Sequence, residues 1–246
     1  MNWFTHISAQ LRRWREKYNP APMSLTQWDD NTEALCAAAL SGDLAEVKRL
    51  IPLSNPLDND SEALQKAAAA GHVACVRLLL PVSDPQAADS MALYLASSNG
   101  FSECVRLLAP HSAAPVFSGS ALTSAVFNDH HECVAILAPL CGPEICRKAL
   151  LDAVRKNSFR SVDVLWPYVN DKFRSTRPLA NALERKQEEM IAFLIPRSNL
   201  RTTLTWMRNN VYGNSEQLEE IIAQQLNEKI HKHIGEIPTK KTERKI

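Results

Sequence analysis

Six cysteines and a pair of histidines are the side chains of this sequence with the most reactive chemistry. Cys75, Cys104 and Cys133 recur at intervals of 29 residues, and His130 and His131 stand just before the last of them. Cysteine and histidine at suitable spacing bind zinc, and a histidine beside a cysteine can activate its thiol as a nucleophile. The first question is therefore whether the chain builds a metal site or a thiol enzyme.

The spacing argues against both. No two cysteines form a CxxC pair. Equivalent positions of neighbouring packed helices lie about 10 Å apart, too far for ligands of one ion. The sequence also lacks a glycine-rich phosphate loop, an HExxH motif and a nucleophile elbow. We therefore expect no metal, no cofactor and no catalytic residue, and we interpret the thiols, including Cys141 and Cys146, as structural.

The cysteines are part of an internal repeat, whose period decides the fold. The pair Ala34-Leu35 recurs five times at steps of 29, 29, 29, 28 and 29 residues, ending as Pro178-Leu179. Five further columns keep the same register: an alanine, a turn residue, a valine or isoleucine, a leucine and a proline. In that order they comprise Ala38, Ala67, Ala96, Ala125, Ala153 and Ala182; Gly42, Gly71, Gly100, Asp129, Asn157 and Lys186; Val47, Val76, Val105, Val134, Val162 and Ile191; Leu50, Leu79, Leu108, Leu137, Leu165 and Leu194; and Pro52, Pro81, Pro110, Pro139, Pro167 and Pro196.

Each column has a physical interpretation. The alanines indicate close approach of two helices, and Gly, Asp or Asn tolerates the left-handed conformation that ends a helix. Lys186 breaks that pattern, so we expect a more strained or reshaped turn there. The Val-x-x-Leu stripe predicts a second, antiparallel helix, which proline ends or bends. Each unit is thus a helix, a tight turn and a helix, and stacked units form a solenoid.

The stretch from Ala63 to Leu80, with Gly71-His72 at its centre, resembles the ankyrin repeat, and the resemblance covers roughly residues 31–199. It implies an all-α, ankyrin-like αα solenoid of six to seven helix-turn-helix repeats. His131, close to the Gly-His position, is expected to bond across its turn. The family's Thr-Pro-Leu-His opening is absent, and the period is 29 rather than about 33 residues. We therefore expect shortened inter-repeat loops with little or no strand. The 34-residue period of the alternative TPR-like array is absent.

Four segments are predicted. Residues 1–20 form an amphipathic helix that caps the array, 24–199 six repeats, 200–235 a degenerate capping repeat, and 236–246 a disordered basic tail. The apolar residues of the first segment are Trp3, Ile7, Leu11, Trp14 and Tyr18. This pattern leaves open a helix that binds a membrane surface or a partner, or a targeting signal.

Composition excludes several function classes. The 246 residues carry 28 basic and 27 acidic side chains, so the near-neutral charge does not favour nucleic acid as a specific partner. With no secretory signal pattern and no apolar stretch of about 18 residues, we expect a cytoplasmic protein with little role for a membrane. The free cysteines fit a reducing compartment. We also expect a monomer.

The resemblance implies a protein-protein interaction module that acts through its concave surface without catalysis, as a scaffold, adaptor, inhibitor or immunity-type binder. Two alternatives stay open: a translocated bacterial effector that binds a host protein, and a membrane-associated interaction protein that uses the N-terminal helix. Family contacts fall at the ends of the first helices, where basic later repeats suit an acidic partner surface. The predicted partner-binding residues are Tyr94, Asn99, Phe127, Asn128, Arg155, Lys156, Arg174 and Arg185.

Overall fold

The structure is a computed structural model that describes residues 25–112, 115–209, 219–220 and 224. The chain divides into two compact units, a first unit of Met1–Val169 and a second unit of Asn170–Ile246. The predicted N-terminal helix (1–20) and basic tail (236–246) lie outside the described residues. Of the predicted capping repeat (200–235), the structure describes residues 200–209, 219–220 and 224.

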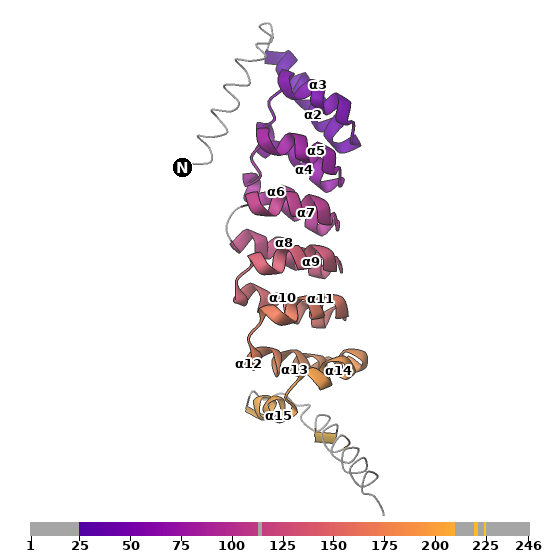
Figure 1. The fold of residues 1–246 in the computed structure, drawn as a ribbon, viewed down its shortest axis with the longest axis vertical. Helices are drawn as coiled ribbons and strands as arrows, with labels where there is room; N and C mark the ends of the chain where they lie inside the picture. Colours follow the sequence, from indigo (N-terminus) through magenta and orange to yellow (C-terminus); the bar gives the residue numbers. More distant parts are fainter. Residues whose placement is uncertain (1–24, 113–114, 210–218, 221–223, 225–246) are drawn as a thin grey trace, which may run out of the picture. The chain divides into compact units, whose positions relative to one another are not determined.

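The described residues of the first unit form five helical hairpins that follow one another along the chain (Figure 1). We number them repeats 1 to 5, each with a longer first helix and a seven-residue second helix. They are α2 (Leu25–Ser41) with α3 (Leu44–Leu50), α4 (Asp58–Ala69) with α5 (Val73–Leu79), α6 (Ala87–Ser98) with α7 (Ser102–Leu108), α8 (Pro115–Phe127) with α9 (His131–Leu137), and α10 (Pro143–Arg155) with α11 (Phe159–Leu165).

First helices pack on first helices and second helices on second helices, so the unit has two layers with the core between them. The repeated Ala-Leu pair and the alanine four residues after it face this core. In repeat 3, Ala92, Leu93 and Ala96 are buried, and Val105 and Leu108 of the second helix meet them from the other layer. A larger side chain in the alanine column would separate the two layers, because interiors are packed without spare volume.

One hydrogen-bonding pattern ends every first helix. In repeat 2, the amide of His72 donates to the carbonyl of Ala67 at 3.0 Å, and that of Gly71 donates to Ala68 at 3.3 Å. This Schellman arrangement requires a left-handed residue between helix and exit. The whole predicted column adopts it, with φ between 54° and 78° at Gly42, Gly71, Gly100, Asp129, Asn157 and Lys186.

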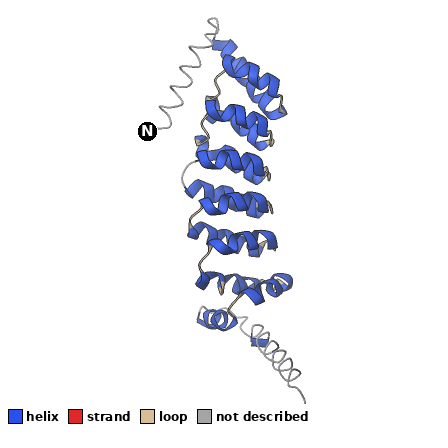
Figure 2. Ribbon diagram, in the orientation of Figure 1, coloured by secondary structure: helices blue, strands red, loops and turns tan. Residues whose placement is uncertain are grey.

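Each proline of the repeat lies in a short 3-10 turn that continues the second helix. Ile51–Leu53 and Leu80–Val82 are examples, with proline at the second position of each turn. No strand occurs among the described residues (Figure 2). The predicted all-α, ankyrin-like solenoid with little or no strand between repeats is thereby confirmed.

Side-chain hydrogen bonds tie a first helix to the inter-repeat connection that follows its hairpin. The hydroxyl of Thr32 accepts the amide of Asn55 at 3.1 Å, and the hydroxyl of Ser61 accepts the amide of Asp84 at 2.8 Å. Ser61 ends a run of three residues with positive φ at the start of α4, and Ser90 ends the equivalent run in α6. The left-handed turn places the hydroxyl of Ser61 within hydrogen-bonding distance of Asp84 in the next connection.

The second unit contains α12 (Asp171–Arg174), α13 (Arg177–Glu184), α14 (Glu188–Leu194) and α15 (Leu200–Asn209). Helices α13 and α14 form a hairpin of the same kind, with Leu179, Ala182, Ile191 and Leu194 buried. None of the helices in the described ranges is long and apolar enough to cross a membrane.

Lys186 keeps the turn of the other repeats rather than reshaping it. Its φ is 54°, and the amide of Gln187 still donates to Ala182 at 3.1 Å. A left-handed backbone conformation costs a non-glycine residue about 1–2 kcal/mol. Glycine avoids this cost, but it also increases the conformational entropy of the unfolded chain, which offsets part of the gain in stability. We expect Lys186→Gly to raise the free energy of unfolding by up to about 1 kcal/mol in urea titrations.

The matched control is Arg185→Gly, because Arg185 is also exposed but has right-handed backbone, with φ −91°. That substitution should lower stability by about 0.5–1 kcal/mol. Equal effects of the two glycines would contradict the strain assigned to Lys186.

Candidate partner-binding surface

Five positions in and just after each first helix of the first unit share one side of the helix. The first stands directly before the Ala-Leu pair, and the others follow that first position at spacings of three, four, seven and eight residues. Of these positions in repeats 1 to 5, only that of Cys36 is buried. We call their sum over repeats 1 to 5 the first-helix face. In repeats 3, 4 and 5 it comprises Met91, Tyr94, Leu95, Ser98 and Asn99; Ser120, Thr123, Ser124, Phe127 and Asn128; and Lys148, Leu151, Asp152, Arg155 and Lys156, all of them exposed or half-buried.

Two aromatic side chains stand out on this face. Phe127, at the end of α8, is 51% exposed, and Tyr94, in α6, is 39% exposed. Phe127 does not belong to the core, because its neighbours Ala125 and Val126 fill the interior positions of that turn. Exposed aromatic side chains of this size are enriched at protein interfaces.

Repeat 5 adds positive charge beside Phe127. The ammonium of Lys156 lies 4.5 Å from the centre of the Phe127 ring, a cation–π contact between neighbouring repeats. Arg155 forms an ion pair with Asp152 at 2.8 Å, and Lys148 is exposed one helical turn earlier than Asp152. The structure thus brings Phe127 and Lys156 together and places Arg155, in the next repeat, beside a carboxylate.

Asn99 and Asn128 connect neighbouring repeats. The side-chain amide of Asn99 donates to the carbonyl of Ala69 at 2.9 Å, and that of Asn128 donates to the carbonyl of Ser98 at 3.0 Å. Both bonds satisfy carbonyls at the end of the preceding first helix, which have no partner within that helix. These asparagines therefore have a structural role, whether or not a partner also contacts them.

Histidines that stand two residues after the position of these asparagines also bond to carbonyls of the preceding repeat. Nε2 of His72 donates to the carbonyl of Leu40 at 3.0 Å, and Nε2 of His130 donates to that of Ser98 at 3.1 Å. A carbonyl only accepts, so this nitrogen carries the proton. The expectation for His131 was wrong: it starts α9, whereas His130 occupies the position of His72 and bonds to the preceding repeat.

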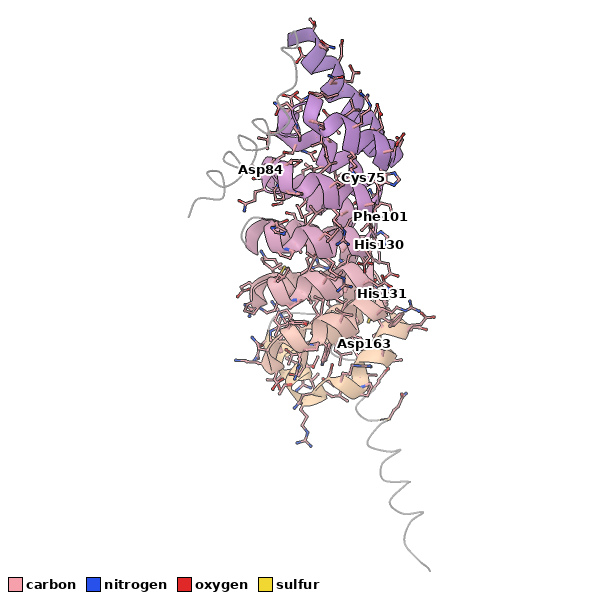
Figure 3. All side chains as sticks on the ribbon, turned by 45° about the horizontal axis from the view of Figure 1, so that its top comes forward. Cys75, Asp84, Phe101, His130, His131 and Asp163 are labelled. Atoms are coloured by element: carbon pink, nitrogen blue, oxygen red, sulfur yellow. The ribbon has the colours of Figure 1, made fainter. Side chains whose placement is uncertain are left out.

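The same residues cover the glycines of the turn column. A Cβ added at Gly71 would lie 2.4 Å from the Phe101 ring, and one at Gly42 or Gly100 would lie within 2.6 Å of His72 or His130. Phe101 and His130 lie one after the other along one edge of the stacked hairpins (Figure 3). Where the following repeat carries the small Ser158, the turn residue is Asp129, which accepts its hydroxyl hydrogen bond.

The cysteines are placed for packing. Cys36, Cys75, Cys104, Cys133 and Cys146 are buried, and all six thiols are free. Burial raises the pKa of Cys104 and Cys133 to about 11, with smaller contributions from neighbouring carboxylates. A protonated, buried thiol is a poor nucleophile and a poor metal ligand. Within the described ranges, no group of histidine, cysteine and acidic side chains is arranged to hold a metal ion.

Arg174 and Arg185 belong to the second unit. Arg174 is half-buried and ion-paired with Asp171, and Arg185 is exposed at the end of α13. The guanidinium of Arg177, which sequence reasoning did not single out, lies 4.3 Å from the centre of the Trp206 ring and 5.9 Å from that of Phe173.

Sequence reasoning also missed several members of the first-helix face, including Met91, Leu95, Lys148 and Leu151. The signal was present, because each stands three, four or seven residues from a predicted contact residue on the same side of a helix. The resemblance to the family predicted contacts in the last turn of each first helix, and these residues lie in earlier turns.

Comparison with known families gives one result. The model of ankyrin repeats (3 copies) matches residues 84–149, a range that runs from the connection before α6 to α10. None of the curated proteins matches the sequence. The resemblance inferred from the repeat columns is thus confirmed for the middle of the first unit.

Proposed function

Because residues 84–149 match the ankyrin repeats, which are in general modules of protein–protein interaction, we propose that this chain binds another protein through its first-helix face. It does so without catalysis, as a scaffold, adaptor or inhibitor. Ankyrin repeats are typically non-catalytic, and the most reactive side chains, the thiols, are held in the core.

One observation carries the proposal. The buried positions of the first helices hardly change from repeat to repeat. At the five positions of the first-helix face, by contrast, only two residue types recur, as Glu33 with Glu62 and as Asn99 with Asn128. A scaffold that only supports itself has no reason to keep Phe127 and Tyr94 exposed in neighbouring repeats. A binding surface has one, because a few aromatic side chains supply most of the energy of an interface.

The test begins with capture of the partner from the organism that makes the chain, followed by titration of the purified pair. We expect Phe127→Ser to weaken binding by about 30-fold or more, the effect of losing one central aromatic side chain. Circular dichroism should show an unchanged fold, since the side chain lies outside the core.

Leu140→Ser is the matched control. Leu140 is 47% exposed, similar to Phe127, but lies in the 3-10 turn of repeat 4 and not on a first helix. Its replacement should leave the affinity unchanged. If Phe127→Ser binds as tightly as the natural chain, or if Leu140→Ser loses as much affinity, the first-helix face is not the binding surface.

A further inference from the structure

The first-helix face changes in polarity and in charge along the first unit. The ten positions of repeats 3 and 4 include no charged side chain, and they combine Met91, Tyr94, Leu95 and Phe127 with small hydroxyl and amide side chains. Apolar atoms exposed among groups that can still form hydrogen bonds are typical of an interface core. This middle stretch suits an apolar side chain of a partner.

Repeat 5 follows with a positive end. Of its five positions, Lys148, Arg155 and Lys156 are basic and Asp152 is acidic. Asp152 accepts from Arg155 at 2.8 Å, so its charge is matched within the repeat. The net positive charge that remains comes from two exposed lysines, one of which already lies against Phe127. Carboxylates of a partner would complement it.

The other end of the face has the opposite sign. Repeat 1 contributes the exposed Glu33, and in repeat 2 Glu62 and Lys66 form an ion pair at 2.9 Å. The first turn of α4 in repeat 2 adds exposed carboxylates at Asp58 and Asp60. Acidic residues of a partner are therefore repelled at repeats 1 and 2 and attracted at repeat 5. This difference in charge determines the end of the face at which those residues bind.

We propose that the first-helix face binds a short linear segment of its partner in which an apolar side chain has acidic residues on one side of it in the sequence. The apolar side chain lies on repeats 3 and 4, at Tyr94 and Phe127, and the carboxylates lie on repeat 5, at Lys148 and Lys156. This inference rests on the proposed function and specifies its partner.

The spacing of the helices sets the length of that segment. Neighbouring packed helices lie about 8–10 Å apart, and an extended chain advances about 3.3 Å per residue. The acidic residues should therefore stand about three residues from the apolar side chain that reaches Phe127. Three repeats require about six residues in all.

The probe is a library of random peptides, each long enough to span three repeats, selected on the immobilised full chain at low salt. We expect enrichment of peptides that carry an aromatic or large aliphatic residue and at least two acidic residues within a few positions of it. A selected peptide, made synthetically, should bind the Lys148→Glu, Lys156→Glu double variant about tenfold or more weakly. Added salt should weaken its binding to the natural chain.

The matched control reverses two charges elsewhere. Lys48 and Arg77 are exposed on the second helices α3 and α5, and their double replacement by glutamate gives the same change in net charge. Binding to this variant should stay within about twofold of the natural chain, because its distant charges are screened. Equal losses in the two double variants would mean a general effect of net charge and would overturn the proposal.

Other outcomes separate the two levels of inference. Selected peptides without acidic residues that still lose affinity with Phe127→Ser overturn the acidic segment and leave the proposed function intact. A selection that enriches no peptide family also overturns the linear segment, and the captured partner then tests the function alone. Peptides and a captured partner that bind the Phe127→Ser variant unchanged overturn both.

Discussion

Gly71→Ala lowers the free energy of unfolding by about 2–5 kcal/mol, which is the first of two large effects that we expect. Two costs add up at this position. Its φ of 75° is left-handed, which costs an alanine about 1–2 kcal/mol. The new Cβ would also lie 2.4 Å from Cδ1 of Phe101, so the ring must move out of a packed interface at a cost of about 1–3 kcal/mol.

A double-mutant cycle separates the two costs. In a Phe101→Ser background the ring is gone, so Gly71→Ala should cost only the conformational part. Asp129→Ala is the matched single control, because Asp129 has the same left-handed backbone but faces the small Ser158. Urea titrations measure all four variants. A coupling energy below about 0.5 kcal/mol between positions 71 and 101 would show that the ring yields freely and that the contact does not restrict the turn.

The second large effect is a loss of stability between pH 8 and pH 10. Burial raises the pKa of Cys36, Cys104 and Cys133 to about 11, from an ordinary value of 9.0. Above pH 9 these thiols ionise in the unfolded chain but stay protonated in the folded one. The unfolded state then binds fewer protons, so stability is complete below pH 9 and falls as the pH rises toward 11.

The size of this effect follows from linkage. Each of the three thiols costs on the order of 1 kcal/mol between pH 8 and pH 10, or a few kcal/mol together. That is a large part of the 5–15 kcal/mol that stabilises a typical domain. Urea titrations at the two pH values, in the presence of a reductant, measure the difference.

Cys104→Ala with Cys133→Ala is the informative variant. It should be less stable than the natural chain at pH 8, because two buried sulfur atoms are lost. Between pH 8 and pH 10, however, it should lose about 2–3 kcal/mol less, since two of the titrating groups are absent. If the variant and the natural chain lose equal stability over this range, other groups cause the alkaline instability.

Much of the fold was predictable because the sequence repeats itself. The alanine, valine and leucine columns correctly indicated two layers of helices, and the Gly, Asp, Asn and Lys column correctly marked the left-handed turn. The short period predicted connections without strands. These inferences need only local rules and one register, and every repeat tests them again.

The contacts between repeats were harder to predict. The bond from His130 to Ser98 and the ring of Phe101 over Gly71 join positions about 30 residues apart, which no local rule connects. A signal existed nevertheless: each glycine of the turn column is followed one repeat later by a ring, and Asp129 by Ser158. The exposure of Phe127 likewise depended on the packing of α8 and not on its sequence pattern.

The pairing of turn residue and ring also restricts the order in which such repeats can follow one another. Repeats 1, 2 and 3 end their first helix in glycine, so each leaves room for a ring or for a smaller side chain in its successor. Repeat 4 ends in Asp129 and leaves room only for a small one. Duplication or deletion can therefore shuffle the early repeats freely, whereas a second copy of repeat 4 placed after the first would set the ring of its histidine against an aspartate. In a chain of this kind, the turn residue of each repeat must fit the side chain that covers it from the next repeat. This requirement limits the arrays that gene rearrangement or protein design can build from it.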